Sequence, residues 1–390
     1  MSRIPTTSAR ADEMRAQFDL PAGMTYLNTC SHAPMLRCAL AAGEAVLARS
    51  GTPWSGPDAE WTAGVERVRM LAAQWFGGDV DGLAFVPSAA YGIATAARNL
   101  PLARGDAVLV LDGQFPSNLL AWQQRCEETG ARIVVARREP GQDWTGAVLA
   151  TLERNADIRI ATLPQAHWHD GAMLDLDRIA RQVRARGAAL VLDLSQSLGA
   201  IAADPARWQA DFVVSVGYKW LLGVTGMALL WAAPHWREHG MPIEHHWSAR
   251  DERTVWQFDP QTPPEYKAGA RRFDAGGVIE LQRLKMFEAA LLQLQEWGPS
   301  MVLDHLQATT DALDAALDDV GLSSWNTAQH APHFTGLRPP PDRFASIAAA
   351  LRDANIICTA RHGVLRIAPH LHVGPADMQR LAELLVRAVS

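Results

Sequence analysis

Lysine is scarce in this chain, so it does not serve as an ordinary surface charge. Only Lys219, Lys267 and Lys285 occur among the 36 lysines and arginines of the 390 residues. Arginine carries the remaining positive charge. Lys219, which follows the apolar stretch VVSVG, therefore needs a local explanation.

Other absences restrict the class of protein. The net charge of −6 argues against nucleic acid as the main partner, because phosphate binding needs a basic face. No run of about 18 apolar residues occurs, so we expect no membrane span. The N-terminus lacks the apolar centre of a secretory signal, and we expect a cytoplasmic protein.

Paired cysteines are also absent. Cys30, Cys38, Cys126 and Cys358 contain no CxxC spacing, which suits neither a zinc site nor a disulfide framework. We expect reduced thiols. His167 and His169 are closely spaced but have no matched partners in the sequence, so we expect no metal site.

Strand-like and helical segments alternate from about residue 60 to about residue 235. Several expected strands are continuous apolar runs, as occurs when helices cover both faces of a sheet. This alternation predicts an α/β sheet that is mostly parallel. Residues 240–272 read as a loop-rich connection, and the long helix LQRLKMFEAALLQLQEWG leads into a C-terminal α+β segment. The strands are expected within DGLAFV, DAVLVL, ARIVVARRE, RIATLPQAHW, AALVLDLSQS, DFVVSVGYKW and GMALLWAAP.

Ligands of such sheets bind beyond the carboxyl ends of the strands, where the chemically interesting side chains of this sequence cluster. Lys219 is either a surface amine that reaches water or a partly buried nucleophile able to form a Schiff base. Asp193 either caps a turn or pairs with the protonated nitrogen of a pyridinium ring. The small residues of PSAAYG could cradle a phosphate at a helix start. Phe115 could stack on a planar ring or simply pack.

Five motifs in this order and spacing resemble one protein family. YLNTCSHAPM, LVLDLSQSLGA, SVGYKWLLG, GARRFDAGG and GVLRIAPH are similar to the class V branch of the fold-type I pyridoxal-phosphate enzymes. That branch includes cysteine desulfurases, kynureninases and isopenicillin N epimerase-like proteins. The resemblance implies a large domain (26–265) with a mostly parallel seven-stranded sheet between helices. It also implies a smaller α+β domain (266–390) and an N-terminal arm (1–25) that packs with it.

The resemblance implies pyridoxal 5'-phosphate as the cofactor and assigns roles position by position. Lys219 matches the lysine that forms the Schiff base, and Asp193 matches the aspartate on the pyridine nitrogen. Gln196 lies near the phenolic oxygen in the family, and Phe115 takes the ring-stacking position. The implied phosphate ligands are Ser88, Ala89, Ala90, Ser215 and Tyr218, and desulfurases carry threonine in the first turn where this chain has alanine.

The same resemblance implies a substrate site and a shared interface. Arg366 matches the arginine that binds the α-carboxylate of an amino acid, a task that suits its planar fork. Family members are usually homodimers, which would bring Gly276 and Gly277 to the partner's cofactor phosphate and Trp247 towards the site. Further expected pocket residues are Cys30, Ser31, His32, His167 and Trp168.

The predicted function is a pyridoxal-phosphate-dependent enzyme that acts on an α-amino acid. We expect a lyase that cleaves a C–S or C–C bond at the β- or γ-carbon after Lys219 removes the α-proton. Cys358 stands in the apolar run NIICTA, which reads as a strand, so persulfide formation on it is not expected. An epimerase, a racemase or an aminotransferase is the alternative, and a catalytically silent binding protein with this fold is an outside possibility.

Overall fold

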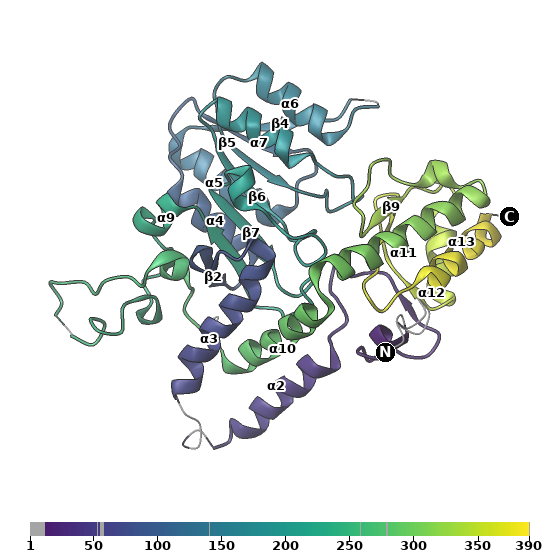
Figure 1. Cartoon of the computed structure of the whole chain (residues 1–390). Coiled ribbons are helices and arrows are strands. Elements are labelled where there is room, and N and C mark those ends of the chain that lie inside the picture. Colours follow the sequence, from purple (N-terminus) through teal and green to yellow (C-terminus); the bar gives the residue numbers. More distant parts are fainter. Residues whose placement is uncertain are drawn as a thin grey trace.

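A computed structural model describes residues 12–52, 54, 58–139, 141–257, 259–277 and 280–389. Its centre is a seven-stranded sheet with the order β2-β8-β7-β6-β5-β3-β4 (Figure 1). Strands β3 to β7 run parallel, and β8 is antiparallel to both of its neighbours. The prediction of a mostly parallel seven-stranded sheet is confirmed. The bounds are β2 Leu83–Val86, β3 Ala107–Leu111, β4 Arg132–Ala136, β5 Ile158–Pro164, β6 Ala189–Asp193, β7 Phe212–Val216 and β8 Ala228–Ala232.

Helices cover both faces of this sheet, which explains the continuous apolar strands. In β3, Val108 and Val110 pack in one cluster with α4 and α5, whereas Leu109 packs in the cluster on the opposite face. Gly92 lets α4 approach β7 closely, because a Cβ there would lie 2.1 Å from Cγ1 of Val214. The helices are α2 Arg37–Arg49, α3 Asp58–Ala73, α4 Ala89–Asn99, α5 Leu120–Thr129, α6 Trp144–Arg154, α7 Leu176–Ala185, α8 Pro205–Trp208, α9 Pro234–His239 and α10 Leu281–Trp297.

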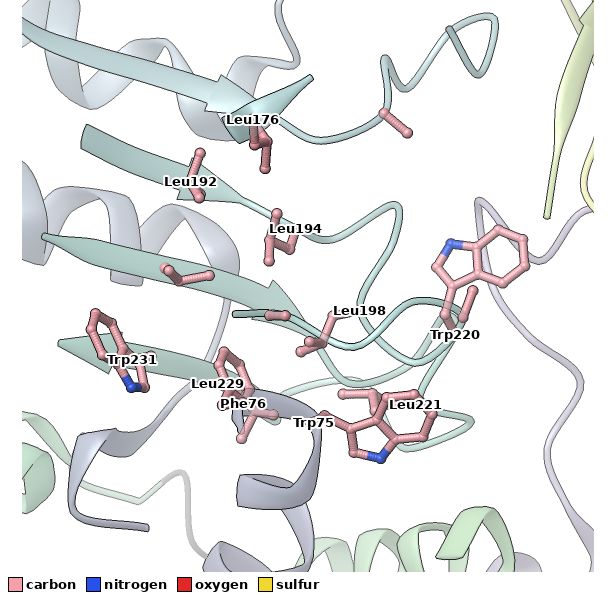
Figure 2. Close-up of a cluster of buried hydrophobic side chains, with 14 of the residues drawn as sticks. Trp75, Phe76, Leu176, Leu192, Leu194, Leu198, Trp220, Leu221, Leu229 and Trp231 are labelled. Carbon is pink, nitrogen blue, oxygen red and sulfur yellow. The ribbon is translucent and has the colours of Figure 1, made fainter. Parts of the chain in front are cut away.

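The larger hydrophobic cluster lies on the face that α3, α6, α7 and α10 cover. Figure 2 shows part of it, where Leu192 of β6 and Leu229 and Trp231 of β8 share a layer with Trp75 and Phe76. All of these side chains are buried. Burial of this kind contributes about 25 cal/mol per Å² of apolar surface to the stability of the fold, so this cluster fixes the strands in place.

The C-terminal part forms a second, smaller layer. A three-stranded sheet with the order β11-β12-β9 packs with α11, α12 and α13, and β1 pairs in parallel with β10. Figure 1 shows the N-terminal residues beside this part, and Arg15 donates to the carbonyl of His372 at 2.9 Å. The bounds are β1 Thr25–Tyr26, α11 Pro299–Asp319, β9 Thr335–Leu337, α12 Phe344–Asp353, β10 Ile356–Ile357, β11 Thr359–Arg361, β12 Val364–Ile367 and α13 Pro375–Val389.

Two long helices join the two parts of the chain. Helix α10 packs on α2 and α3 beside the large sheet, while α11 packs on α13 in the C-terminal part (Figure 1). The division at residue 265 stays a prediction. The described residues of the segment after α9 include the short 3-10 helices Trp247–Ala249 and Gly269–Phe273, and the segment projects away from the C-terminal part. In the described part of the chain, no helix is both long and apolar enough to cross a membrane.

Candidate active site

A cavity of about 190 Å³ lies at the carboxyl edge of the large sheet. Strand β3 pairs in parallel with both β4 and β5, so the order in which successive strands are added to the sheet reverses between β3 and β5, and open α/β sheets bind ligands at such points. The loops after five strands reach the cavity. Its walls are Pro87, Ser88, Ala89, Gln114, Phe115, Ser117, Pro164, Ala166, Trp168, Asp193, Ser195, Gln196, Val216, Tyr218, Lys219, Thr225 and Gly226.

Lys219 enters the cavity from the tight loop that follows β7. Gly217 begins this loop, and only glycine fits because a Cβ would lie 2.8 Å from the carbonyl oxygen of Met227. The loop closes when the amide of Gly223 donates to the Gly217 carbonyl at 2.9 Å. The Lys219 side chain is only 8% exposed, and no described residue hydrogen-bonds its amine. Burial lowers the pKa of Lys219, since the charged form loses its water.

Asp193 ends strand β6 on the neighbouring edge position. Its Oδ1 accepts from the amide of Ser195 at 3.0 Å, whereas Oδ2 accepts from no described residue. The side chain is 8% exposed and lines the cavity. A buried carboxylate oxygen without a partner is unfavourable, so the cavity suits a ligand that donates a hydrogen bond to Oδ2 of Asp193.

The start of helix α4 forms one corner of the cavity, and its amides could bind a phosphate. Ser88 is the N-cap, and its Oγ accepts from the amide of Tyr91 at 3.1 Å. The amides of Ala89 and Ala90 belong to the first turn, where no carbonyl of the same helix can accept them. Such a corner suits an anion.

Ser215, which was expected to be a phosphate ligand, does not line the cavity. It is a fully buried residue of β7, and its Oγ lies 3.4 Å from the carbonyl oxygen of Leu194. Ser195 lines the cavity instead, together with Thr225 and Gly226.

Aromatic side chains form one wall of the cavity. The Phe115 ring lies 5.8 Å from the Lys219 amine and meets Trp168 edge to face, with 5.4 Å between the ring centroids. The Tyr218 ring lies 5.9 Å from the same amine and stacks on His32 at 4.7 Å. These rings leave room for a flat ligand near Lys219.

Arg366 reaches the same region from strand β12 of the C-terminal part. Its Nη1 donates to the carbonyl oxygen of Trp168 and its Nη2 to Oγ of Ser31, both at 2.8 Å. Its Nε is buried without an acceptor in the described structure, and the side chain is 5% exposed. Arg366 is close enough to Lys219 to lower the pKa of that lysine further, after the larger effect of burial. It does not line the cavity itself, but it donates to the carbonyl of Trp168, which does.

Cys30 and Gln196 connect these groups beneath the surface. The Gln196 side chain lines the cavity, and its Nε2 donates to the carbonyl oxygen of Cys30 at 3.1 Å. Burial raises the pKa of the Cys30 thiol to about 11, despite the nearby charges of Arg366 and Lys219. The thiol is therefore protonated at neutral pH.

Four other predicted site residues lie outside the cavity of the single chain. His167 is buried behind it, stacks on Trp144 and contacts Oδ1 of Asp170 at 3.2 Å through Nδ1. Trp247 lies on the projecting segment, and its ring centroid is 5.6 Å from that of Trp256. The Gly276 amide donates to Glu244 at 2.8 Å, and Gly277 follows with a φ of 71°. The structure thus brings together the strand-end groups and leaves these four elsewhere.

Sequence reasoning missed several cavity residues. Gln114 and Ser117 flank the predicted Phe115, and Gln114 is buried with its Nε2 towards the carbonyl of Thr162 at 3.4 Å. The rule that ligands bind at strand ends could have found them. Thr225 and Gly226 stand before β8, an antiparallel strand, and no strand-end pattern points to them. No three His, Cys, Asp or Glu side chains gather as a metal site in the described segments.

Comparisons with known proteins agree with this geometry. The family model described as aminotransferase class-V matches residues 43–373. An uncharacterized aminotransferase of Bacillus subtilis (strain 168) is 26% identical and covers 82% of this chain and 83% of its own length. A kynureninase of Deinococcus radiodurans is 28% identical over 71% of this chain and 67% of its own. An isopenicillin N epimerase of Streptomyces clavuligerus is 25% identical over 96% and 97%.

Solved structures share the fold. A cysteine desulfurase of Thermococcus onnurineus NA1 superposes with a TM-score of 0.82 at 15% identity and covers 99% of both chains. A C-DES variant with glycine linked to its PLP cofactor gives a TM-score of 0.83 at 19% identity, over 95% of this chain and 98% of its own. The expected fold-type I architecture is confirmed, and identities this low speak for the fold alone.

Proposed function

Since this chain belongs to the class-V aminotransferase family, we propose that it is a lyase that cleaves a C–S or C–C bond of an α-amino acid. Its cofactor is pyridoxal 5'-phosphate. The observation that carries the proposal is the buried Lys219 amine, which faces the cavity with no hydrogen-bond acceptor among the described residues.

The residues present fit this cofactor. Asp193 offers an unpaired carboxylate oxygen that would hold a proton on the pyridine nitrogen, and the first turn of α4 offers free amides for the phosphate. Phe115 would lie against the ring, and Gln196 would lie near the phenolic oxygen. When bound, pyridoxal phosphate supplies an electron sink for the negative charge that develops at the substrate α-carbon.

Lys219 would serve as the base of the reaction. Burial lowers the pKa of Lys219 and so favours the neutral amine, the form that can accept the α-proton of the substrate. The same amine would later return a proton to the product. Tyr218 would stay protonated beside it, because burial first and the charge of Asp193 second raise the pKa of Tyr218.

Arg366 would bind the α-carboxylate of the substrate. Its two terminal nitrogens are held by the Trp168 carbonyl and Ser31, while the buried Nε has no acceptor. A carboxylate that bonds Nε and one terminal nitrogen would complete the guanidinium in its planar, two-donor mode. Ser31 and Trp168 would move aside or share that carboxylate.

The thiols of Cys358 and Cys30 argue against a persulfide-forming desulfurase and against an epimerase that uses a thiol base, and so favour another lyase. Cys358 joins β10 to β11, outside the cavity, and burial raises its pKa to about 12. It therefore offers no mobile thiolate to take sulfur as a persulfide. Cys30, with a pKa of about 11, is likewise a poor second base for proton exchange on the opposite face of the substrate.

An epimerase, racemase or aminotransferase remains the second candidate. His32 stacks on Tyr218 at the cavity and could supply a second acid or base for epimerisation. The similarity to isopenicillin N epimerase over nearly the whole chain supports this alternative, while the similarity to kynureninase supports a lyase. The similarity to the Bacillus subtilis aminotransferase supports transamination.

A substrate screen with the holoenzyme tests the reaction type. Amino acids with sulfur, chlorine or acyl groups at the β-carbon are incubated with the enzyme, and 2-oxo acids, ammonia and alanine are measured. Without an amino acceptor, a lyase releases 2-oxo acid and ammonia from the sulfur or chlorine substrates, or alanine and a carboxylic acid from the acyl substrates. Release of 2-oxo acid that requires an added acceptor would identify an aminotransferase, and inversion at the α-carbon without product would identify an epimerase.

A homodimer that shares its active sites also belongs to this proposal. Gly276, Gly277 and Trp247 lie outside the cavity of their own chain, as expected if they serve a partner's site. Sedimentation of the holoenzyme should give twice the chain mass. A chain mass together with full activity would contradict this arrangement.

A further inference from the structure

A second cavity, of about 460 Å³, lies between the large-sheet part and the C-terminal part. It shares no lining residue with the cavity around Lys219. One wall comes from the loop after β4 and the start of α6, and the other comes from residues 324–329 and Arg338. Its size suits a small organic molecule.

Two arginines from opposite walls converge at this cavity. Nη2 of Arg138 and Nη2 of Arg338 both donate to Oδ2 of Asp170, at 3.1 and 2.6 Å. Arg338 also donates to Oγ1 of Thr327 at 2.9 Å. The remaining N–H groups of both guanidinium groups have no acceptor among the described residues, and each side chain is about a third exposed or more, at 31% and 44%.

The nearby carboxylates of Asp170 and Asp143 leave N–H groups of Arg138 and Arg338 without an acceptor. Asp170 is buried, and its Oδ1 is occupied by Nδ1 of His167 and by the amide of Ala172, both at 3.2 Å. Asp143, which also lines the cavity, accepts from the amide of Gly146 at 2.6 Å as the N-cap of α6. One buried carboxylate therefore faces two guanidinium groups that still have donors to offer.

The rest of the lining is partly apolar. Trp144, Trp325 and Met173 contribute to the walls, and Arg138 lies over the Trp144 ring at 4.4 Å. A ligand that fills this space has a planar anionic group for the arginines and an apolar body for these side chains. A carboxylate on a small apolar or aromatic frame meets both requirements, whereas inorganic phosphate meets only the first.

We propose that this cavity binds a small organic carboxylate, which Arg138 and Arg338 hold between the two parts of the chain. The site shares no lining residue with the cavity around Lys219. Asp170, which both arginines contact, stands in the same loop as Trp168, whose carbonyl accepts from Arg366.

Titration calorimetry of the holoenzyme with sodium benzoate, against sodium chloride at equal ionic strength, tests the proposal. Arg138→Gln and Arg338→Gln should each weaken benzoate binding about tenfold or more, as expected for a lost charge-assisted bond. Arg137→Gln is the matched control, because Arg137 is the exposed neighbour outside the lining and should leave the affinity unchanged. The cofactor absorbance should not shift as benzoate binds.

A variant that blocks the cavity sterically controls for the possibility that loss of an arginine displaces Asp170. Ala328→Trp adds bulk to an exposed lining position and leaves both arginine–Asp170 bonds in place, so it should abolish benzoate binding. Binding that survives all three changes, or that shifts the cofactor absorbance with the same affinity, would place benzoate elsewhere and overturn the proposal. Inorganic phosphate that binds as tightly as benzoate would overturn the assignment to organic carboxylates.

Discussion

At the large sheet, two places where a basic and an acidic side chain are both buried are built in opposite ways. Arg69 of α3 and Asp274 are 1% and 4% exposed, and Nη2 lies 2.8 Å from Oδ2. Oδ1 of Asp274 also accepts from the amide of Phe85 at 2.8 Å, and Nη1 of Arg69 donates to the carbonyl of Leu83 at 2.7 Å. Lys219 and Asp193, each 8% exposed, leave an amine and an oxygen without partners in the described structure.

The difference separates structure from chemistry. A buried charge without partners costs free energy, so a fold keeps one only where a ligand completes it. The bonds of Arg69 and Asp274 fasten α3 and the FDAGG loop to the edge strand β2. Lys219 and Asp193 also stand at the ends of buried strands, but their polar atoms are left for a ligand to contact.

The largest expected effect is that of Lys219→Ala. Catalysis should fall below detection, and the covalent absorbance band of the bound cofactor should vanish, because no other lysine of the described residues lines the cavity. The free energy of unfolding of the apoprotein should change by less than about 1 kcal/mol, since removal of a buried amine without a partner offsets the lost packing of its alkyl chain. Absorbance spectra and urea unfolding measure both. A strong loss of stability would make Lys219 a structural residue and remove the contrast.

Arg69→Ala should give the reverse result. It leaves Asp274 buried without its cation, which costs about 3–5 kcal/mol of unfolding free energy. Any properly folded fraction should still bind the cofactor covalently. The control is Arg37→Ala, whose ion pair with Asp19 is exposed on both sides and is expected to contribute less than about 1 kcal/mol. Equal effects of the two variants would contradict the structural role of the Arg69 pair.

Acid should destabilise the C-terminal part through its buried histidines. Burial lowers the pKa of His333 and His370 to about 3 and that of His372 to about 4. The unfolded chain binds these protons near pH 6.5, so the free energy of unfolding falls as pH drops below that value, by about 2 kcal/mol per histidine between pH 7 and pH 5. In urea unfolding at several pH values, His372→Gln should have a shallower pH dependence than the wild type. An unchanged slope would mean that His372 is accessible.

The smallest expected effect is that of Cys358→Ala. A half-buried thiol outside the cavity has no part in the proposed reaction, so turnover should stay within about twofold and stability should fall by about 1 kcal/mol. Steady-state assays of the purified variant measure this. Complete loss of sulfur release would restore a persulfide-forming reaction as the function.

The placement of Lys219 and Asp193 at one cavity could be predicted from the sequence because the pattern behind it is local. Lys219 and Asp193 follow directly on apolar strands, and parallel strands bring their carboxyl ends to one edge. The contact between Arg366 and the Trp168 carbonyl joins residues 198 positions apart, and no local pattern encodes it. Ser215 and Ser195 illustrate a further limit, because which serine reaches a cavity depends on side-chain direction at a strand end and not on residue type.

The two arginines at the second cavity could not be predicted from the sequence. Arg138 and Arg338 are ordinary members of an arginine-rich sequence, and only the fold brings them to one oxygen of Asp170. The resemblance assigns a role to the glycines of FDAGG, whereas in the single chain its Asp274 accepts hydrogen bonds from both Arg69 and the Phe85 amide.

Reduction of the holoenzyme with borohydride followed by peptide mass spectrometry tests the central claim most directly. With only Lys219, Lys267 and Lys285 in the chain, the lysine that carries the cofactor can be identified without ambiguity. The account predicts a pyridoxyl group on the peptide that contains Lys219, at full occupancy. A pyridoxyl group on Lys267 or Lys285, or on none of the three, would contradict it.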